Sequence, residues 1–219
     1  MTTIEHKKRD QEPLYQNNMG TSVAIGGEGF VVIASDTRMS LDEDNYCILT
    51  RNSTKVYELT KTCCLTGSGM RADVQELVEV IKKEIKKYRY ANNKDMSVKS
   101  IAQLVQCVLY SKRTFPYYWF TMLCGIENGK GIVYHYDAIG SYTGNQFDAA
   151  GSGQQIIMPI VDSQLKKRTE RLSVTEAQNI ARDALTSTAE IEIYTGDDCE
   201  LVTITEEGVK RERFFMVKD

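Results

Sequence analysis

The sequence predicts an α+β fold in which antiparallel sheets are covered by pairs of helices. Apolar runs typical of strands come first, and they are followed by two segments with helical spacing, more strands, two further helices and a last pair of strands. Strands and helices do not alternate one by one, which disfavours a doubly wound parallel sheet. The chain has 219 residues, 42% of them apolar, which is enough for one large domain with a buried core.

The stretch from Met19 to Arg38 is predicted to form the first two strands. Thr21, Val23 and Ile25 alternate with smaller residues, a glycine-rich turn follows, and a second apolar run occupies 30–34. Residues 40–52 contain an acidic cluster that lacks the glycine and closing glutamate of a calcium-binding loop, so we expect a solvated loop there. A second hairpin is expected at 54–59 and 62–66.

Two consecutive helices are predicted next. From Ala72 to Tyr90 apolar residues recur at helical spacing on one face, with charged residues opposite. Ser97 suits the N-cap of a second helix, whose inner face carries apolar residues from Ile101 to Leu109. Because only a short turn separates the two segments, we expect a helical hairpin that covers a sheet.

The second half of the chain has the same order of elements. An Asn-Gly pair at 128–129 between apolar runs is a strong signal for a β-hairpin, and further strands are expected around residues 142 and 147. Helical spacing resumes after 153 despite Pro159, and Ser173 with Glu176 is a capping box for a fourth helix. The last strand pair is predicted at 201–205 and 209–217.

Composition and charge narrow the classes of function. The net charge is −3, with 27 basic and 30 acidic residues interspersed, so no broad positive surface is expected for nucleic acid or a membrane. Six cysteines without CxxC spacing and two histidines offer few ligands for zinc, and we expect buried, reduced thiols. The sequence shows neither a membrane-spanning apolar run nor the apolar core of a signal peptide. We therefore expect a protein of the cytoplasm and nucleus, with no metal and no cofactor.

Two segments allow more than one interpretation. Residues 110–119 interleave Lys112 and Arg113 with five aromatic residues, a pattern that can stack on single-stranded nucleic acid. Without wider positive charge, packing at a strand start or at a subunit contact is favoured. Residues 1–18 are polar and charged, and they are a disordered tail, a propeptide, or a strap that lies on a neighbouring subunit, with composition slightly favouring disorder.

Several motifs in fixed order resemble those of the proteasome β subunits from Gly20 to Asp219. They are SVAIGGEGFVVIASDTR, STKVYEL, LTGSGMRAD, KRTFPYYW, GKGIVYHYDAIGSY, AAGSGQQ and EIYTGD. Within that family, LYSKRTFPYY and GKGIVYHYDAIGSY look most like the non-catalytic beta-6 class, also called β type-1. The resemblance implies the four-layer αββα sandwich of two antiparallel sheets, the N-terminal nucleophile hydrolase fold. It also implies an uncleaved, propeptide-like N-terminal extension at 1–19 and a proteasome β-type domain at 20–219.

The resemblance further implies a role and partners. A non-catalytic β subunit completes the β ring of the 20S core particle for ATP- and ubiquitin-dependent protein degradation. Its partners would be neighbouring β subunits, an α-ring subunit and the opposite β ring. Such a subunit is not itself an enzyme, although it is part of a proteolytic complex.

The same resemblance assigns candidate site residues. Active members of the family use a threonine, freed as the N-terminal residue, as nucleophile and its own α-amine as base. The residues that orient it match Asp36, Arg38, Lys55 and Ser152, and the family's later aspartate and serine fall on Glu192 and Thr195. Counting back sixteen residues from Asp36 places Gly20 at the nucleophile position, and glycine has no hydroxyl.

Three hypotheses follow. In the first, Gly20 leaves the site without a nucleophile, and Asp36, Arg38 and Lys55 persist as a salt-bridged cluster. In the second, cleavage after Gly20 makes Thr21 the nucleophile of an active threonine endopeptidase. Strand geometry argues against Thr21, because adjacent side chains point to opposite faces, and against Ser22, which lies about 6.6 Å beyond Gly20. The third, a free-standing binding module, would be supported by a stable monomer.

Overall fold

The computed structural model describes residues 15–41, 46–166 and 171–216. These residues form two five-stranded sheets, a two-stranded sheet and four α-helices. The elements, in chain order, are β1 (Thr21–Gly27), β2 (Phe30–Asp36), β3 (Met39–Leu41), β4 (Cys47–Thr50), β5 (Val56–Thr60), β6 (Cys63–Gly69), α1 (Arg71–Asn92), α2 (Val98–Ser111), β7 (Trp119–Glu127), β8 (Lys130–Tyr136), β9 (Tyr142–Asn145), β10 (Phe147–Gly151), α3 (Gln154–Lys166), α4 (Val174–Ile191), β11 (Asp198–Thr205) and β12 (Gly208–Phe215).

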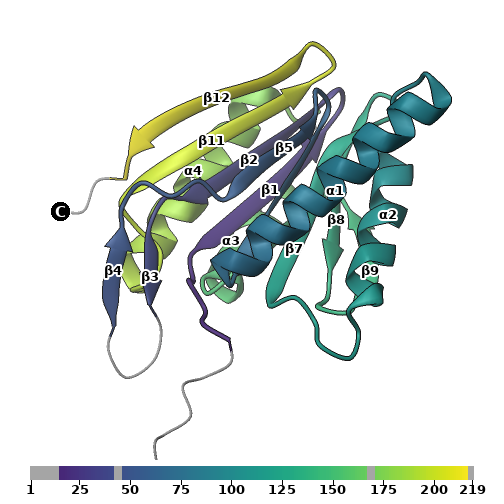
Figure 1. Cartoon of the computed structure of the whole chain (residues 1–219). Coiled ribbons are helices and arrows are strands. Elements are labelled where there is room, and N and C mark those ends of the chain that lie inside the picture. The colour runs from purple at the N-terminus through teal and green to yellow at the C-terminus, as the bar shows by residue number, and fades with distance from the viewer. Residues whose placement is uncertain (1–14, 42–45, 167–170, 217–219) are drawn as a thin grey trace, which may run out of the picture.

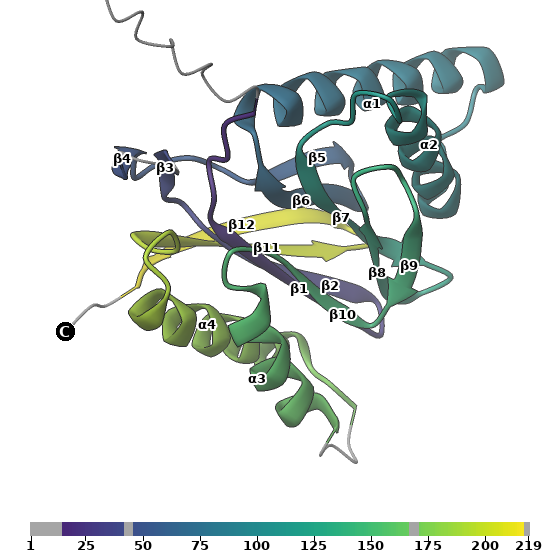
Figure 2. The same cartoon turned by 90° about the horizontal axis from the view of Figure 1, so that it is seen from below.

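The two large sheets are antiparallel and stack face to face between two pairs of helices. One sheet has the strand order β10-β1-β2-β11-β12, and the other has the order β5-β6-β7-β8-β9. Helices α1 and α2 lie over the outer face of the second sheet, and α3 and α4 lie over the outer face of the first (Figures 1 and 2). The predicted α+β class and the αββα sandwich are therefore confirmed.

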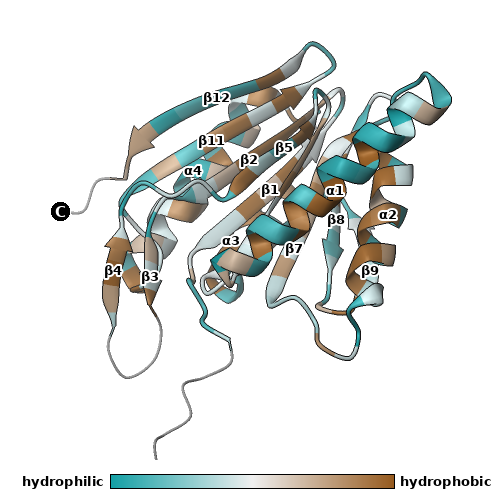
Figure 3. Ribbon diagram, in the orientation of Figure 1, coloured by the Kyte–Doolittle hydropathy of each residue, from teal (hydrophilic) through white to brown (hydrophobic). Residues whose placement is uncertain are grey.

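Strand β2 shows why the chain adopts this layering. All seven of its residues are buried, so it needs apolar cover on both faces. Val32 and Ala34 pack with α3 and α4, whereas Val31 and Ile33 pack in the layer between the two sheets. Figure 3 shows apolar residues along the central strands, and both apolar and polar residues along α1, whose apolar residues are buried. The burial of this apolar surface is the main favourable contribution to folding.

The structure contains the helices and the turn that local signals in the sequence predict. The predicted apolar stripe of α1 is buried, and the Ser97 hydroxyl caps α2 by accepting a hydrogen bond from the Ser100 amide at 3.2 Å. Asn128 and Gly129, with φ of 50° and 74°, make the turn between β7 and β8. A turn with two positive φ values matches the twist of the strands it joins.

Two expectations need correction. Residues 40–52 are not only a loop, because β3 and β4 form a small separate sheet there (Figure 1). Its sequence gives little strand signal because the residues of β4 are exposed or half-buried. The acidic residues 42–44 lie outside the described residues. The thiols are also not all buried. All six cysteines are free, but Cys47 and Cys107 are exposed and only the other four are buried.

Two negative findings apply to the described residues. No helix among them is both long enough and apolar enough to cross a membrane. In the same residues, no three histidine, cysteine, aspartate or glutamate side chains lie together as a metal site would require.

Replacing Ser173 with alanine is expected to destabilise the chain by about 1 kcal/mol. The Ser173 hydroxyl accepts a hydrogen bond from the Glu176 amide at 3.3 Å, and the Glu176 carboxylate accepts one from the Ser173 amide at 2.9 Å. Urea unfolding of the Ser173→Ala variant tests this. Ser187→Ala is the matched control, because Ser187 is an exposed residue inside the same helix, where alanine is the better helix former. Equal losses in the two variants would contradict the cap.

Candidate functional site

The candidate site begins where the chain turns into β1. Met19 and Gly20 have φ values of 54° and 95°, a conformation that glycine adopts far more easily than other residues. The Gly20 carbonyl accepts a hydrogen bond from the Ser152 amide at 3.2 Å. The backbone of Gly20 also passes close to Gly151: a Cβ added to Gly151 would lie 2.0 Å from the Gly20 carbonyl oxygen. The turn is therefore fixed against the end of β10.

A side chain at the position predicted for the nucleophile would meet two buried side chains. A Cβ added to Gly20 would lie 2.3 Å from Cε of Lys55 and 2.7 Å from Oδ1 of Asp36. Both atoms belong to buried side chains. The space that a threonine would need is thus occupied by the Lys55–Asp36 pair.

Lys55 and Asp36 form a buried ion pair with all donors of the ammonium group used. Lys55 Nζ lies 2.9 Å from Asp36 Oδ1 and donates to the backbone oxygens of Asp36 and Arg38 at 2.8 and 2.6 Å. The Asp36 carboxylate also accepts hydrogen bonds from the amides of Thr21 (2.8 Å), Arg38 (3.2 Å) and Gly196 (3.4 Å). Burial raises the pKa of Asp36 above 3.8, and Lys55 and the amides offset part of this rise. The pair joins the ends of β1 and β2 to the start of β5.

Arg38 belongs to a second ion pair. Its guanidinium lies on Asp197, with Nε 2.9 Å from Oδ2, and it donates to the Ile193 carbonyl at 2.7 Å. Burial opposes ionisation of Asp197, but hydrogen bonds from Arg38 and Arg51 outweigh it and hold the pKa of Asp197 below 3.8. The side chains of Asp36 and Lys55 are therefore paired with each other, and Arg38 joins them only through its backbone.

Asp197 is a site residue that the sequence reasoning missed. Asp197 is the last residue of the EIYTGD motif, and Asp198 follows it, so the sequence does place an acidic residue at this point. Which of the two carboxylates reaches Arg38 depends on the backbone at Asp197, where φ is 69°. Aspartate adopts a positive φ more often than most residues do, but the sequence does not show which of the two aspartates does so here.

The Thr21 hydroxyl lies in a separate hydrogen-bonded chain. Thr21 Oγ1 accepts a hydrogen bond from the Gly153 amide at 2.8 Å and lies 2.7 Å from Thr195 Oγ1. Thr195 in turn donates to Glu192 Oε2 at 2.6 Å. Because the Thr195 proton is used on Glu192, the proton between the two threonines comes from Thr21.

Ser152 completes this second group by donating to the same Glu192 oxygen at 2.7 Å. The structure thus separates the candidate residues into two sets. Asp36 and Lys55 adjoin Gly20, whereas Ser152 and Glu192 are connected to the hydroxyl of Thr21 through Thr195. Ser22 belongs to neither set: its hydroxyl is buried and has no hydrogen-bond partner among the residues that the structure describes.

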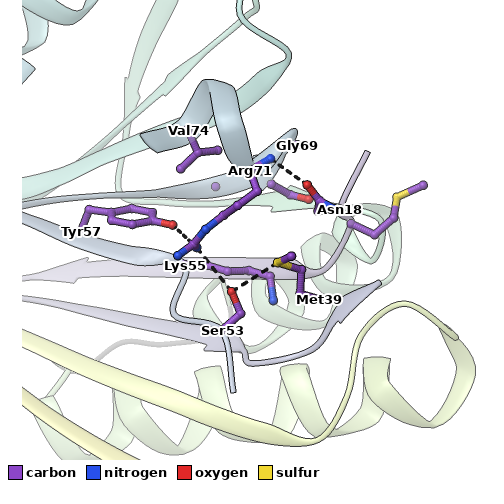
Figure 4. A pocket seen from close by; sticks show the side chains of 11 residues that line it. Asn18, Met39, Ser53, Lys55, Tyr57, Gly69, Arg71 and Val74 are labelled. Atoms are coloured by element: carbon purple, nitrogen blue, oxygen red, sulfur yellow. Dashed lines mark hydrogen bonds between the residues drawn. The ribbon is translucent and has the colours of Figure 1, made fainter. Parts of the chain in front are cut away.

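A small cavity lies next to the Lys55–Asp36 pair (Figure 4). It measures about 20 Å³, and Lys55, Tyr57 and Arg71 are among the residues that line it. The Arg71 guanidinium, at the wall of this cavity, donates to the Thr54 carbonyl at 2.8 Å and to the Tyr57 hydroxyl. A space of this size holds about one water molecule, so it does not accept a peptide side chain.

The chain matches the family model described as "Proteasome subunit" over residues 17–204. It is 42% identical to proteasome subunit beta type-1 of Oryza sativa subsp. japonica, with 94% of this chain and 97% of that protein covered. It is also 42% identical to proteasome subunit beta type-1 of Arabidopsis thaliana, with 94% and 96% covered. Identity to proteasome subunit beta type-6 of Saccharomyces cerevisiae is 36%, with 100% and 94% covered.

Proposed function

The chain belongs to the proteasome subunit family, and from this premise we propose that it is a non-catalytic β subunit of the 20S core particle. The similar plant and yeast proteins are named as β subunits of types 1 and 6. The subunit would complete a β ring and support ATP- and ubiquitin-dependent protein degradation without performing the peptide cleavage itself.

One observation carries the non-catalytic part of the proposal. The family reaction needs a hydroxyl on the residue at position 20, and this residue is a glycine whose side-chain space is filled by Lys55 and Asp36. The absence of a hydroxyl and the crowding at this position both support a subunit without its own nucleophile. The Asp36–Lys55 pair would then serve stability, because a buried charge without its partner is unfavourable.

The alternative, an endopeptidase that uses Thr21, has less support from the geometry. The Thr21 hydroxyl is fully buried, and its oxygen both donates to Thr195 and accepts from Gly153. Its nitrogen is a backbone amide that donates to Asp36. A nucleophile must instead present its oxygen to the substrate with a base within reach.

The remaining parts of the proposal concern partners, location and organisation. We expect contacts with neighbouring β subunits, an α-ring subunit and the opposite β ring, and a location in the cytoplasm and nucleus. The N-terminal extension 1–19 would precede a β-type domain at 20–219. No cofactor, metal or nucleic acid is required by this role.

The state of the N-terminus in assembled particles tests the proposal. We expect mass spectrometry of the purified 20S particle to find a chain that still contains Gly20 and residues before it. A chain that begins at Thr21 would contradict the non-catalytic assignment, because only such a chain has a free amine next to the Thr21 hydroxyl.

Replacing Thr21 with alanine is expected to leave every peptidase activity of the assembled particle unchanged. The reason is that the Thr21 hydroxyl is used in hydrogen bonds within the subunit. Peptidase assays with the activity expressed per assembled particle provide the measurement, and Thr21→Ser, which keeps the hydroxyl, is the control. Selective loss of one activity in Thr21→Ala, with Thr21→Ser unaffected, would refute the prediction.

A further inference from the structure

The residues directly before Gly20 are anchored to the rest of the fold. We call Tyr15–Met19 the arm segment. At its start, the Tyr15 ring stacks on Phe115 and Tyr118, with 5.4 Å between ring centroids in both cases. The Tyr15 hydroxyl donates to the Pro116 carbonyl at 2.8 Å. Aromatic contacts of this kind, with the polar end satisfied, are typical of an anchored segment and not of a free tail.

The backbone of Asn18 is bonded on both sides. Its amide donates to the carbonyl of Gly69, the last residue of β6, at 3.1 Å. Its carbonyl accepts a hydrogen bond from the amide of Ser40, in β3, at 3.3 Å. Asn18 therefore connects two elements as an extended peptide does when it adds to the free backbone groups of a strand.

The Asn18 side chain adds two more hydrogen bonds. Its oxygen accepts from the Arg71 amide at 2.8 Å (Figure 4), and its nitrogen donates to the Ser40 carbonyl at 3.3 Å. Arg71 is the first residue of α1, and the N-cap residue Met70 makes no side-chain cap hydrogen bond. The arm segment thus supplies the cap that the helix does not provide for itself.

These four backbone groups, the Gly69 carbonyl, the Ser40 amide and carbonyl and the Arg71 amide, form what we call the Asn18 seat. Asn18 is buried there, although the neighbouring Gln16 is exposed. Asn18 and Met19 also form part of the wall of the small cavity beside Lys55. An occupant of the Asn18 seat therefore covers the approach to the Lys55–Asp36 pair.

We propose that the Asn18 seat, together with the ring contacts around Tyr15, is a binding site for an extended peptide, and that the arm segment of the same chain is its resident ligand. The site recognises a tyrosine and, three residues later, an asparagine. Its occupation caps α1 and covers the small cavity beside Lys55, next to Gly20. This inference goes beyond the non-catalytic role, and it rests on it in one respect, because the arm segment stays attached only if the chain is not cut after Gly20.

Hydrogen exchange in assembled particles tests whether the seat is occupied. In the unmodified chain, the amides of Asn18, Ser40 and Arg71 are expected to exchange slowly. In Asn18→Ala, exchange at Ser40 and Arg71 is expected to become about tenfold faster, because two side-chain hydrogen bonds are lost. Gln16→Ala is the matched control and should leave these rates unchanged. If the Asn18 amide of the unmodified chain exchanges as fast as in a free peptide, the proposal is wrong.

Peptide binding tests whether the seat recognises its ligand. A labelled peptide with the sequence of residues 10–20 is expected to bind particles carrying Tyr15→Ala and Asn18→Ala, and not particles with the unmodified chain. The same peptide with alanine in place of asparagine 18 should bind at least about tenfold more weakly. Equal binding of the two peptides, equal binding to the two particles, or no binding to particles that contain the variant would overturn the proposal. The N-terminal mass tests the non-catalytic role separately: a particle whose chain keeps the arm segment can still fail the exchange and peptide tests, and only the Asn18 seat proposal would then be overturned.

Discussion

A threonine at position 20 is expected to destabilise the chain by about 2–5 kcal/mol and to produce no peptidase activity. Gly20 has a φ of 95°, which is strained for any residue with a Cβ, and that Cβ would lie 2.3 Å from Lys55 Cε. This range is the sum of about 1–2 kcal/mol of backbone strain and about 1–3 kcal/mol of overpacking. Urea unfolding followed by the fluorescence of Trp119, the only tryptophan in the chain and a buried one, measures the loss.

A pair of alanine variants separates the two contributions. Gly29 also has a positive φ, 76°, but a Cβ added to it would meet no atom within 4 Å. Gly29→Ala should therefore show only the strain, about 1–2 kcal/mol, whereas Gly20→Ala should lose clearly more. Similar losses in the two variants would show that Lys55 moves aside easily and that the site is not closed by it.

Replacing Lys55 with methionine is expected to destabilise the chain by about 3–5 kcal/mol, because it leaves the Asp36 carboxylate buried without its counter-charge. The Asp36 side chain is fully buried, and Lys55 is the only side chain that forms an ion pair with it among the described residues. Unfolding in urea provides the measurement. Lys166→Met is the control: Lys166 forms an ion pair with Asp162 on an exposed helix face, and its loss should change stability by less than about 0.5 kcal/mol.

The stability of the Lys55→Met variant is also expected to depend on pH. Burial already raises the pKa of Asp36 above 3.8, and loss of Lys55 removes the largest influence that opposes the rise. A carboxyl group whose pKa is raised in the folded state binds its proton more tightly when folded, so protonation relieves the cost of burying it. The stability deficit of Lys55→Met is therefore expected to be largest at neutral pH and to shrink as the pH falls through the raised pKa. A deficit that is constant over this range would contradict this origin.

The sequence predicts most of the fold because the relevant signals are local. Ser173 and Glu176 specify a helix start within four residues, and Asn128 with Gly129 specifies a turn within two. The apolar stripe of α1 identifies its buried face without knowledge of what covers it. The face-to-face stacking of the two sheets cannot be derived from these local patterns. It was implied by the family resemblance alone.

The parts that escaped prediction depend on contacts between residues far apart in the chain. Arg38 and Asp197 are separated by 159 residues, and Asn18 and Arg71 by 53. Composition slightly favoured disorder for residues 1–18. Of these, 1–14 lie outside the described residues, but Tyr15 and Asn18 are held by rings and backbone groups that only the folded chain brings near them. Tertiary contacts can override composition in this way because a few anchored side chains suffice to order a short segment.

The order of strands in the two large sheets has a consequence for synthesis on the ribosome. Strands β5 to β9 are consecutive in both the chain and their sheet, so this sheet can be completed once residue 145 has emerged. In the other sheet, β2 lies between β1 and β11, and β11 begins only at Asp198. The apolar strand that carries Asp36 is thus made early and gains its second neighbour late. During that interval its free edge is open to pairing with other chains, as exposed edges of apolar strands generally are.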